Sequence, residues 1–244
     1  MNIALVGHGK MGQLVEIYAQ KRGHVVVAII DPNTSINLDT LLDKNIDVVI
    51  EFSVPSVTLD HMIFYAEHNM RVIMATTGWY DQMDMVKSLF ADSQGALLWS
   101  SNFSLGVHIF WRMIENASKI MNQFDDYDVF GHEFHHSAKV DSPSGTALTT
   151  SQILLDNIDR KTTLVTETLS HRKILPEELH FSSTRGGSMP GTHAVYFDSL
   201  FDTITIEHQA RNREGFALGS VVCAEWLRGK RGYFEIQDFI KGIM

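Results

Sequence analysis

A glycine-rich turn between a predicted strand and a predicted helix constrains the fold of this chain more than any other feature. Residues 2–6 are a short run of apolar, β-forming residues, and the pattern G-x-G-x-x-G follows at once. A helical pattern then continues to about residue 22, and a second apolar run at 24–30 ends on Asp31, 19 positions after Gly12. This order of strand, turn, helix, strand and acid is typical of a unit that binds the diphosphate and ribose of a dinucleotide. The predicted cofactor contacts are Gly7, His8, Gly9, Lys10, Met11, Gly12 and Asp31.

Asp31 also bears on which nicotinamide cofactor the turn would take. Its carboxylate should repel a 2′-phosphate, which favours NADH over NADPH. Lys10 lies in the turn and offers a cation that would partly compensate, although it is equally well explained as a solvated side chain. Both cofactors therefore stay open, with a preference for NADH. An ordinary tight strand–helix turn is the alternative to a cofactor site.

Strands and helices alternate over the first hundred residues. Apolar runs at 47–52, 71–75 and 96–100 predict further buried strands, and helical patterns separate them, two of which lie across 57–69 and near 81–91. Apolar strands that alternate with helices form a parallel sheet with both faces covered. The first part of the chain therefore predicts an α/β fold with a Rossmann-type doubly wound parallel sheet.

The order of predicted strands and helices changes after about residue 106. One amphipathic helix is predicted across 107–121, and strand-like runs then follow in closer succession, with a single helix among them at 145–156. This pattern predicts a second, α+β unit with a mixed or antiparallel sheet. A final helix is predicted at 215–227. The strand-like runs cover residues 128–135, 164–169, 179–184, 193–198 and 203–208.

Composition excludes several classes of partner. Lys and Arg number 20 against 29 Asp and Glu, a net charge of −9, so no global positive field attracts a nucleic acid or an anionic membrane. The one cysteine, Cys223, excludes an intrachain disulfide and a cysteine-based metal cluster. No apolar run approaches the ~20 residues of a membrane span, and the first residues lack a signal-peptide pattern. We expect a cytoplasmic protein.

Residues 132–136 match the zinc-protease pattern H-E-x-x-H, which requires a helix. The preceding residues are β-formers, and a loop rich in Ser, Pro and Gly follows, so a strand is predicted here instead. On a strand, residues four positions apart are separated by roughly 13 Å. Two ligands at that separation cannot share one zinc ion with bonds of about 2.1 Å. We expect no metal site.

A second candidate site lies where the predicted strand ends and the helix at 145–156 begins. Two imidazoles precede an ammonium within five residues, and Ser144 is a predicted N-cap after which the first N–H groups of the helix point outward. Such a group of donors suits a small substrate with carboxylates and a proton to exchange. The alternative is a surface turn with solvated histidines. The candidate residues are His135, His136, Lys139, Gly145 and Thr146.

Residues 135–147 resemble the signature of the 4-hydroxy-tetrahydrodipicolinate reductase family, also called dihydrodipicolinate reductases. Further segments resemble other parts of that family's pattern, in the right order and over almost the whole chain. Two details depart from it: the glycine turn is one residue shorter than the family's longer form, and Ala75 stands where glycine is common. The further segments are residues 51–55, 75–78, 100–107, 185–187 and 191–193.

The resemblance implies an enzyme of lysine and diaminopimelate biosynthesis that uses NAD(P)H to reduce 4-hydroxy-tetrahydrodipicolinate to tetrahydrodipicolinate. Hydride would go to ring C4 with loss of water, while His135 acts as proton donor and acceptor and Lys139 as a second donor. The developing enamine needs an acid that titrates near neutrality, which histidine supplies. The implied contacts of the small dicarboxylate substrate are His136, Gly145, Thr146 and Arg213, with Arg211 as the alternative to Arg213. The further implied cofactor contacts are Ala75, Thr76, Thr77, Ser100, Ser101, Asn102 and Phe103.

The resemblance also implies the domain organisation. A dinucleotide-binding domain would comprise residues 1–106 and 214–244, and residues 107–213 would form a substrate-binding domain whose sheet assembles a homotetramer. Two other functions stay open: a dehydrogenase for another small, amino-acid-type substrate, and a module that senses NAD(H) without catalysis. The second would usually carry a DNA-binding or partner-binding segment, which the sequence does not suggest.

Overall fold

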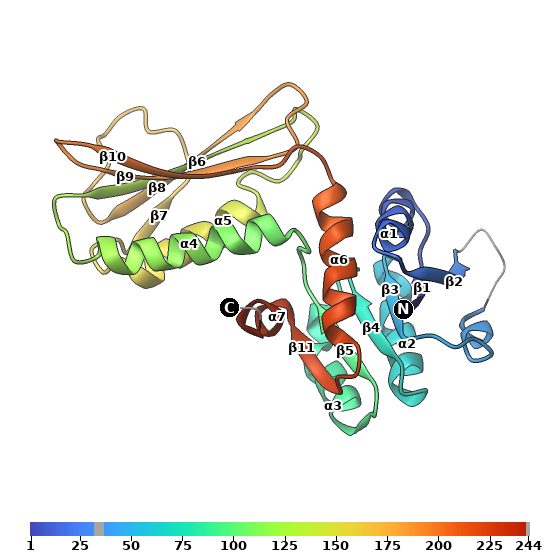
Figure 1. The fold of residues 1–244 in the computed structure, drawn as a ribbon. Helices are drawn as coiled ribbons and strands as arrows, with labels where there is room; N and C mark the ends of the chain where they lie inside the picture. The colour runs from blue at the N-terminus through green and yellow to red at the C-terminus, as the bar shows by residue number, and fades with distance from the viewer. Residues whose placement is uncertain (32–36, 243–244) are drawn as a thin grey trace. The chain divides into compact units, whose positions relative to one another are not determined.

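The computed structural model describes residues 1–31 and 37–242. The chain forms two compact units, each with its own sheet (Figure 1). The first unit comprises Met1–Ser104 and Glu214–Met244, and the second comprises Leu105–Arg213. Among the described residues, none of the helices combines the length and the apolar character that crossing a membrane requires.

The first unit contains a parallel sheet of six strands in the order β11-β5-β4-β3-β1-β2. The sequence-based expectation of a Rossmann-type parallel sheet is confirmed. The strand order reverses between β1 and β3, and in open α/β sheets ligands bind outside the carboxyl ends of the strands at such a point. The strands are β1 Asn2–Val6, β2 Val25–Ile30, β3 Val48–Glu51, β4 Arg71–Met74, β5 Ala96–Trp99 and β11 Gly232–Glu235.

Helices follow the strands of the first unit as the alternation predicts. The central strands β1, β3, β4 and β5 are buried at almost every position, so the sheet is covered on both faces. Helix α1 packs against α6, and α2 packs against α3. The helices are α1 Lys10–Lys21, α2 Pro55–Glu67, α3 Met83–Asp92, α6 Glu214–Leu227 and α7 Ile236–Gly242.

Three details of the first unit differ from the expectation. Strand β2 was expected to be buried, but it lies at the edge of the sheet and Val25 is 58% exposed. The helix expected between β2 and β3 falls partly outside the described residues, and residues 37–47 form one 3-10 turn, Leu38–Leu41. The sequence analysis missed β11 and α7. Strand β11, GYFE, is half-buried at every position and lacks the continuous apolar run that identified the other short strands, and α7 has only seven residues.

The second unit contains a mixed sheet of five strands in the order β10-β9-β6-β8-β7, as predicted. Strands β10, β9 and β6 pair antiparallel, whereas β6, β8 and β7 pair parallel. Helices α4 and α5 lie on the same face of this sheet (Figure 1). Strand β7 is shorter than predicted and ends at Val165. The elements are α4 Leu105–Met121, β6 Asp128–His135, α5 Gly145–Asn157, β7 Thr163–Val165, β8 Glu178–Arg185, β9 Thr192–Asp198 and β10 Thr203–Gln209.

Strand β6 determines which side chains reach the helix-covered face of this sheet. Its residues alternate between buried and more exposed positions, because successive side chains of a strand point to opposite faces. Glu133 and His135 therefore point the same way as Val129, which belongs to the apolar core under the helices. The strand brings a carboxylate and an imidazole to one end of that core.

Candidate active site

The carboxyl ends of β1, β3 and β4 surround an open pocket of about 460 Å³ in the first unit. The pocket lies where the strand order reverses, the position at which this class of sheet binds ligands. It brings the glycine turn together with the turn after β4, two segments that are more than sixty positions apart in the sequence. The lining residues are Gly9, Lys10, Met11, Gly12, Phe52, Ser53, Pro55, Ala75, Thr76 and Thr77.

The three positions of the turn are glycine for different physical reasons. Gly7 has φ +87°, and a Cβ there would lie 2.3 Å from the carbonyl oxygen of Phe52. A Cβ on Gly12 would lie 2.1 Å from the carbonyl oxygen of Gly7, so both positions are glycine because the turn is tightly packed. A Cβ on Gly9 would meet nothing within 4 Å. Gly9 lines the pocket and precedes α1, so its bare backbone leaves a cradle at the helix N-terminus that fits a diphosphate.

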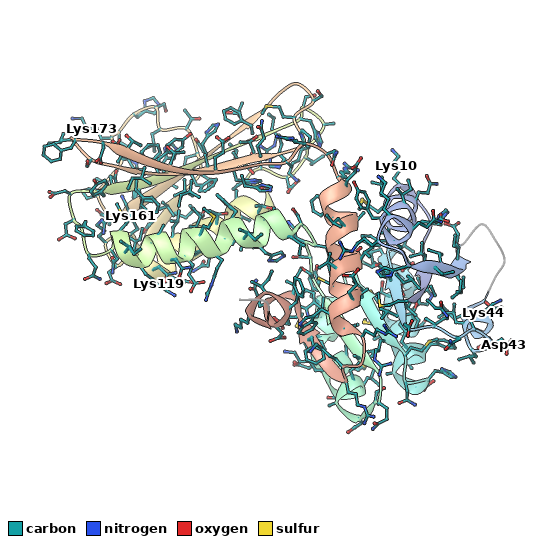
Figure 2. All side chains as sticks on the ribbon, viewed as in Figure 1. Lys10, Asp43, Lys44, Lys119, Lys161 and Lys173 are labelled. Atoms are coloured by element: carbon teal, nitrogen blue, oxygen red, sulfur yellow. The ribbon has the colours of Figure 1, made fainter. Side chains whose placement is uncertain are left out.

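Asp31 lies beside this turn, as its place at the end of β2 predicts. Its Oδ2 accepts a hydrogen bond from the backbone N–H of His8 at 2.9 Å. The His8 ring in turn lies 2.7 Å from a carboxylate oxygen of Glu16 in α1. Lys10 opens α1 and is exposed (Figure 2). The turn therefore presents one carboxylate and one cation.

The turn after β5 is held by its own hydrogen bonds. Ser100 Oγ donates to the carbonyl oxygen of Asn102 at 2.6 Å and accepts the Asn102 N–H at 3.1 Å. The side chain of Phe103 is buried, and Ser101 is exposed. These four residues are not among those that line the pocket, so the structure groups only two of the three expected cofactor turns.

A buried carboxylate lies directly behind the pocket. Glu51 is fully buried and accepts hydrogen bonds from Ser53 Oγ and, at 2.6 Å, from Tyr65 OH, while His61 Nδ1 lies 2.9 Å away. Ser53 Oγ is also 3.4 Å from the hydroxyl of Thr76, which lines the pocket as well. Phe52, Ser53 and Pro55 were not among the predicted site residues, although the resemblance of residues 51–55 to the family pattern was a signal for them.

In the second unit, polar side chains surround Glu133, which is fully buried. Oε1 of Glu133 accepts the N–H of Ser144 at 2.9 Å and lies 2.8 Å from Arg185 Nη2. Oε2 accepts the Ser144 hydroxyl and lies 3.3 Å from His135 Nδ1 and 3.2 Å from His193 Nε2. We call Glu133, His135, Ser144, Arg185 and His193 the Glu133 cluster.

The buried environment shifts two pKa values in this cluster. Burial alone raises the pKa of Glu133, but hydrogen bonds from His193, Ser144 and Arg185 outweigh it and hold the pKa well below its ordinary value. Burial lowers the pKa of His135 to about 4, against the opposing effect of the Glu133 charge. The expectation of an imidazole that titrates near neutrality is therefore wrong for the ligand-free chain, in which His135 is neutral at pH 7.

The turn between β6 and α5 places the other predicted substrate contacts close to this cluster. Lys139 Nζ lies 2.7 Å from Asp141 Oδ1, and Arg185 Nη2 donates to the carbonyl oxygen of Asp141 at 2.6 Å. Ser144 caps α5 as predicted, because its Oγ accepts the N–H of Ala147 at 3.2 Å. The predicted residues that the structure groups here are His135, His136, Lys139, Gly145 and Thr146.

Arg213 and Arg211 are both exposed in the segment after β10. In the described part of the chain, neither contributes a hydrogen bond or an ion pair to the Glu133 cluster. Sequence reasoning treated Glu133 only as part of the H-E-x-x-H pattern and assigned no role to Arg185. The strand alternation that puts Glu133 on the same face as His135 was the available signal for the acid.

The segment that matches H-E-x-x-H is a strand, as its flanks predict. His132 lies on the opposite face from Glu133, and its Nδ1 is 2.5 Å from the hydroxyl of Ser182. A different set, Glu133, His135 and His193, has ligand atoms within 4.8 Å of one another. Arg185 already balances the charge of that carboxylate, which makes the set a poor cation site.

The parallel sheet of the first unit and its glycine turn define the chain as a Rossmann-type dinucleotide-binding protein. Two family models then cover almost all of it: the N-terminal part of dihydrodipicolinate reductase matches residues 1–103, and the C-terminal part matches residues 106–240. The chain belongs to the dihydrodipicolinate reductase family, as the sequence resemblance indicated.

Individual relatives agree with this assignment. A 4-hydroxy-tetrahydrodipicolinate reductase of Christiangramia forsetii is 36% identical over 243 residues, which are 100% of this chain and 99% of that protein. One from Chromobacterium violaceum is 35% identical over 199 residues, which are 80% of this chain and 73% of that protein. The solved dipicolinate-bound dihydrodipicolinate reductase from Paenisporosarcina sp. TG-14 is 20% identical, with a TM-score of 0.78 over 96% of this chain and 97% of that one. That structure confirms the predicted fold class.

Proposed function

We propose that the chain is a cytoplasmic enzyme that reduces 4-hydroxy-tetrahydrodipicolinate to tetrahydrodipicolinate with NAD(P)H, in lysine and diaminopimelate biosynthesis. The observation that carries the proposal is the placement of His135 and Lys139 beside the capped N-terminus of α5. A dicarboxylate needs cations and N–H donors, and this turn offers both. The solved relative from Paenisporosarcina sp. holds dipicolinate, itself a ring with two carboxylates.

The first unit would hold the cofactor, which supplies the hydride for ring C4 of the substrate when it is bound. The open backbone at Gly9 and the N-terminus of α1 receive the diphosphate. The carboxylate of Asp31 accepts from the ribose hydroxyls and disfavours a 2′-phosphate, which inclines the chain toward NADH. Lys10 offers the opposite charge beside it. The remaining proposed contacts come from the turns at Ala75–Thr77 and Ser100–Phe103.

The second unit would bind the substrate by its carboxylates. The N–H groups of Gly145 and Thr146 receive one of them, since a helix N-terminus attracts anions. Lys139 and His136 add donors from the preceding turn, and Arg213 is a further proposed contact. Lys139 is paired with Asp141 at 2.7 Å in the ligand-free chain. A substrate carboxylate would share or replace that partner.

His135 is the proposed proton donor for the ring carbon next to C4, with Lys139 as the second donor. The neutral imidazole of the ligand-free chain must first gain a proton to act in this way, because burial lowers the pKa of His135 to about 4. A dicarboxylate bound beside the imidazole adds negative charge and raises this pKa. Substrate binding would therefore create the proton donor that the reaction uses.

The test is to follow NADH absorbance with freshly generated 4-hydroxy-tetrahydrodipicolinate. We expect substrate-dependent oxidation by the wild-type chain. His135→Ala and Lys139→Ala should each lower kcat by about 100-fold or more, the usual size of a general acid's contribution, with the Kd for NADH unchanged. Folded wild-type protein that oxidises no NADH with this substrate would end the proposal. Unchanged turnover in either variant would remove the role of that residue.

We propose further that the chain assembles as a homotetramer through the sheet of the second unit. Helices α4 and α5 cover one face of this sheet (Figure 1). The opposite face carries Phe130, 37% exposed and stacked on Tyr196 at 5.0 Å, together with Phe134, 38% exposed. Exposed aromatic side chains on the uncovered face of a sheet support a contact with a second copy of the chain.

A further inference from the structure

Glu133 ties the first turn of α5 to strand β6. Its Oε1 accepts the backbone N–H of Ser144 at 2.9 Å, and its Oε2 accepts the Ser144 hydroxyl. The same hydroxyl caps α5, because its oxygen accepts the N–H of Ala147 at 3.2 Å. The carboxylate therefore fixes the place at which Gly145 and Thr146 present their N–H groups.

The same carboxylate faces one edge of the His135 ring. Nδ1 of His135 lies 3.3 Å from Oε2 of Glu133. This nitrogen is buried, and it makes no hydrogen bond within the described ranges 1–31 and 37–242. On the other edge, a Cβ on Gly191 would lie 2.8 Å from Nε2, so the glycine keeps the space beside Nε2 clear. The two ring nitrogens therefore have different surroundings: an anion lies at Nδ1, whereas a glycine without a side chain lies beside Nε2.

Arg185 allows Glu133 to stay charged although the side chain has no exposed surface. The guanidinium lies 2.8 Å from Oε1, and Ser183 Oγ donates to the same oxygen at 2.8 Å. His193 Nε2 lies 3.2 Å from Oε2. A buried carboxylate with this many donors is an anion held in one orientation, because each donor would lose its partner if the group turned.

We propose that Glu133 is a positioning residue: it holds His135 by the Nδ1 edge and, through Ser144, keeps the N-terminus of α5 aligned with that imidazole. The inference rests on the proposed function, in which His135 moves a proton and α5 binds a carboxylate. A carboxylate at Nδ1 selects the tautomer with the proton on that nitrogen and stabilises the imidazolium form. Nε2 is then the atom left to exchange a proton with the substrate.

The pH dependence of turnover distinguishes this role from a structural one. Besides burial, which lowers the pKa of His135, four charged or titratable groups act on the ring: Glu133 from its own strand, His193 from β9, Arg185 from β8 and Lys139 from the turn. Glu133 raises the pKa of His135, whereas the other three lower it. Loss of the Glu133 charge must therefore favour the neutral imidazole at every pH.

The experiment compares Glu133→Gln with a matched control, Glu178→Gln, in the full chain. Glu178 is also a buried carboxylate of this unit, ion-paired with Arg172 at 2.6 Å, and it begins the strand that ends at Arg185. We expect Glu133→Gln to lower kcat by about 100-fold and to move the alkaline limb of the kcat–pH profile down by about one pH unit or more. The Kd for NADH should not change. Glu178→Gln should keep the wild-type limb and a kcat within about threefold of wild type.

If the wild-type chain turns over and the kcat–pH profile of Glu133→Gln matches that of Glu178→Gln, this inference alone is overturned. If the wild-type chain does not turn over, the proposed function and this inference are overturned together. If Glu133→Gln does not fold by circular dichroism, Glu133→Asp replaces it. That variant keeps the charge and withdraws it by one methylene, so kcat should fall about tenfold or more while the alkaline limb stays near its wild-type position. A wild-type kcat in Glu133→Asp would overturn the inference.

Discussion

At the scale of a single residue, the carboxylate of Asp31 has one observed contact and one proposed task. It accepts the N–H of His8 at 2.9 Å, which supports the glycine turn, and it carries the charge that should repel a 2′-phosphate. A substitution that keeps an oxygen acceptor but removes the charge distinguishes the contact from the proposed task. Asparagine is such a substitution, because its amide oxygen can accept the His8 N–H and its side chain is neutral.

Asp31→Asn should therefore raise the ratio of kcat/KM for NADPH to that for NADH by about tenfold, which corresponds to roughly 1.4 kcal/mol. Steady-state kinetics with the two cofactors measure this ratio. Asp31→Ala is the comparison, because it removes the acceptor for His8 as well and should weaken both cofactors. A ratio that stays at the wild-type value in Asp31→Asn would show that this carboxylate does not select the cofactor.

His135 shows what a residue-level argument from the sequence misses. The sequence showed that a histidine lies at this position of the segment, and therefore that an imidazole is available there. It did not show the pKa of that imidazole, because burial lowers the pKa to about 4 and burial depends on residues from β8, β9 and the start of α5. The pKa of a histidine side chain lies near neutrality unless its surroundings shift it, and the sequence does not show those surroundings.

The glycine turn makes a prediction at the scale of an element. Gly9 and Gly12 are glycine for different reasons. The Cβ of an alanine at position 12 would lie 2.1 Å from the Gly7 carbonyl oxygen, whereas the Cβ of an alanine at position 9 would meet nothing within 4 Å. Gly12→Ala should lower the free energy of unfolding by about 1–3 kcal/mol, the usual effect of overpacking.

Gly9→Ala should change the free energy of unfolding by less than about 1 kcal/mol and weaken NADH binding about tenfold or more, because its methyl group occupies the cradle. Thermal unfolding without cofactor and a direct titration with NADH measure the two effects, and each variant serves as the control for the other. Tight NADH binding by a folded Gly9→Ala chain would place the diphosphate elsewhere.

Strand β6 shows how far an element can be predicted. Its β-forming flanks identified a strand and excluded the helical interpretation of residues 132–136. Alternation within the strand then puts Glu133 and His135 on one face, which is a local property. Two further facts depend on how the unit packs: α4 and α5 cover this face, and Ser144 contacts Glu133 there.

The assembly of the whole molecule can be tested by mass. Four chains of 27.5 kDa, about 110 kDa in total, are expected in light scattering after size-exclusion chromatography. Phe130→Glu places a charge on the uncovered face of the second sheet and should shift the mass to smaller species. Phe124→Glu is the control, since Phe124 is 53% exposed and lies in the loop after α4. A tetramer that persists in Phe130→Glu would show that the copies meet elsewhere.

Sequence alone determined the two sheets, the glycine turn, the segment at 135–147 and the family, because each depends on short-range periodicity, turn chemistry or contiguous motifs. It missed β11, which pairs with β5 across more than 130 residues of chain and has no continuous apolar run of its own. Strand pairing over such a separation has no local signature.

Tertiary structure alone decided the chemical state of the second site. Glu133 acquires its partners from positions up to 60 residues away, Ser144, Arg185 and His193, and their donors keep it anionic without exposed surface. The same enclosure keeps His135 neutral in the ligand-free chain. The identities of these residues are written in the sequence, whereas their charges depend on desolvation and on neighbours that only folding brings together.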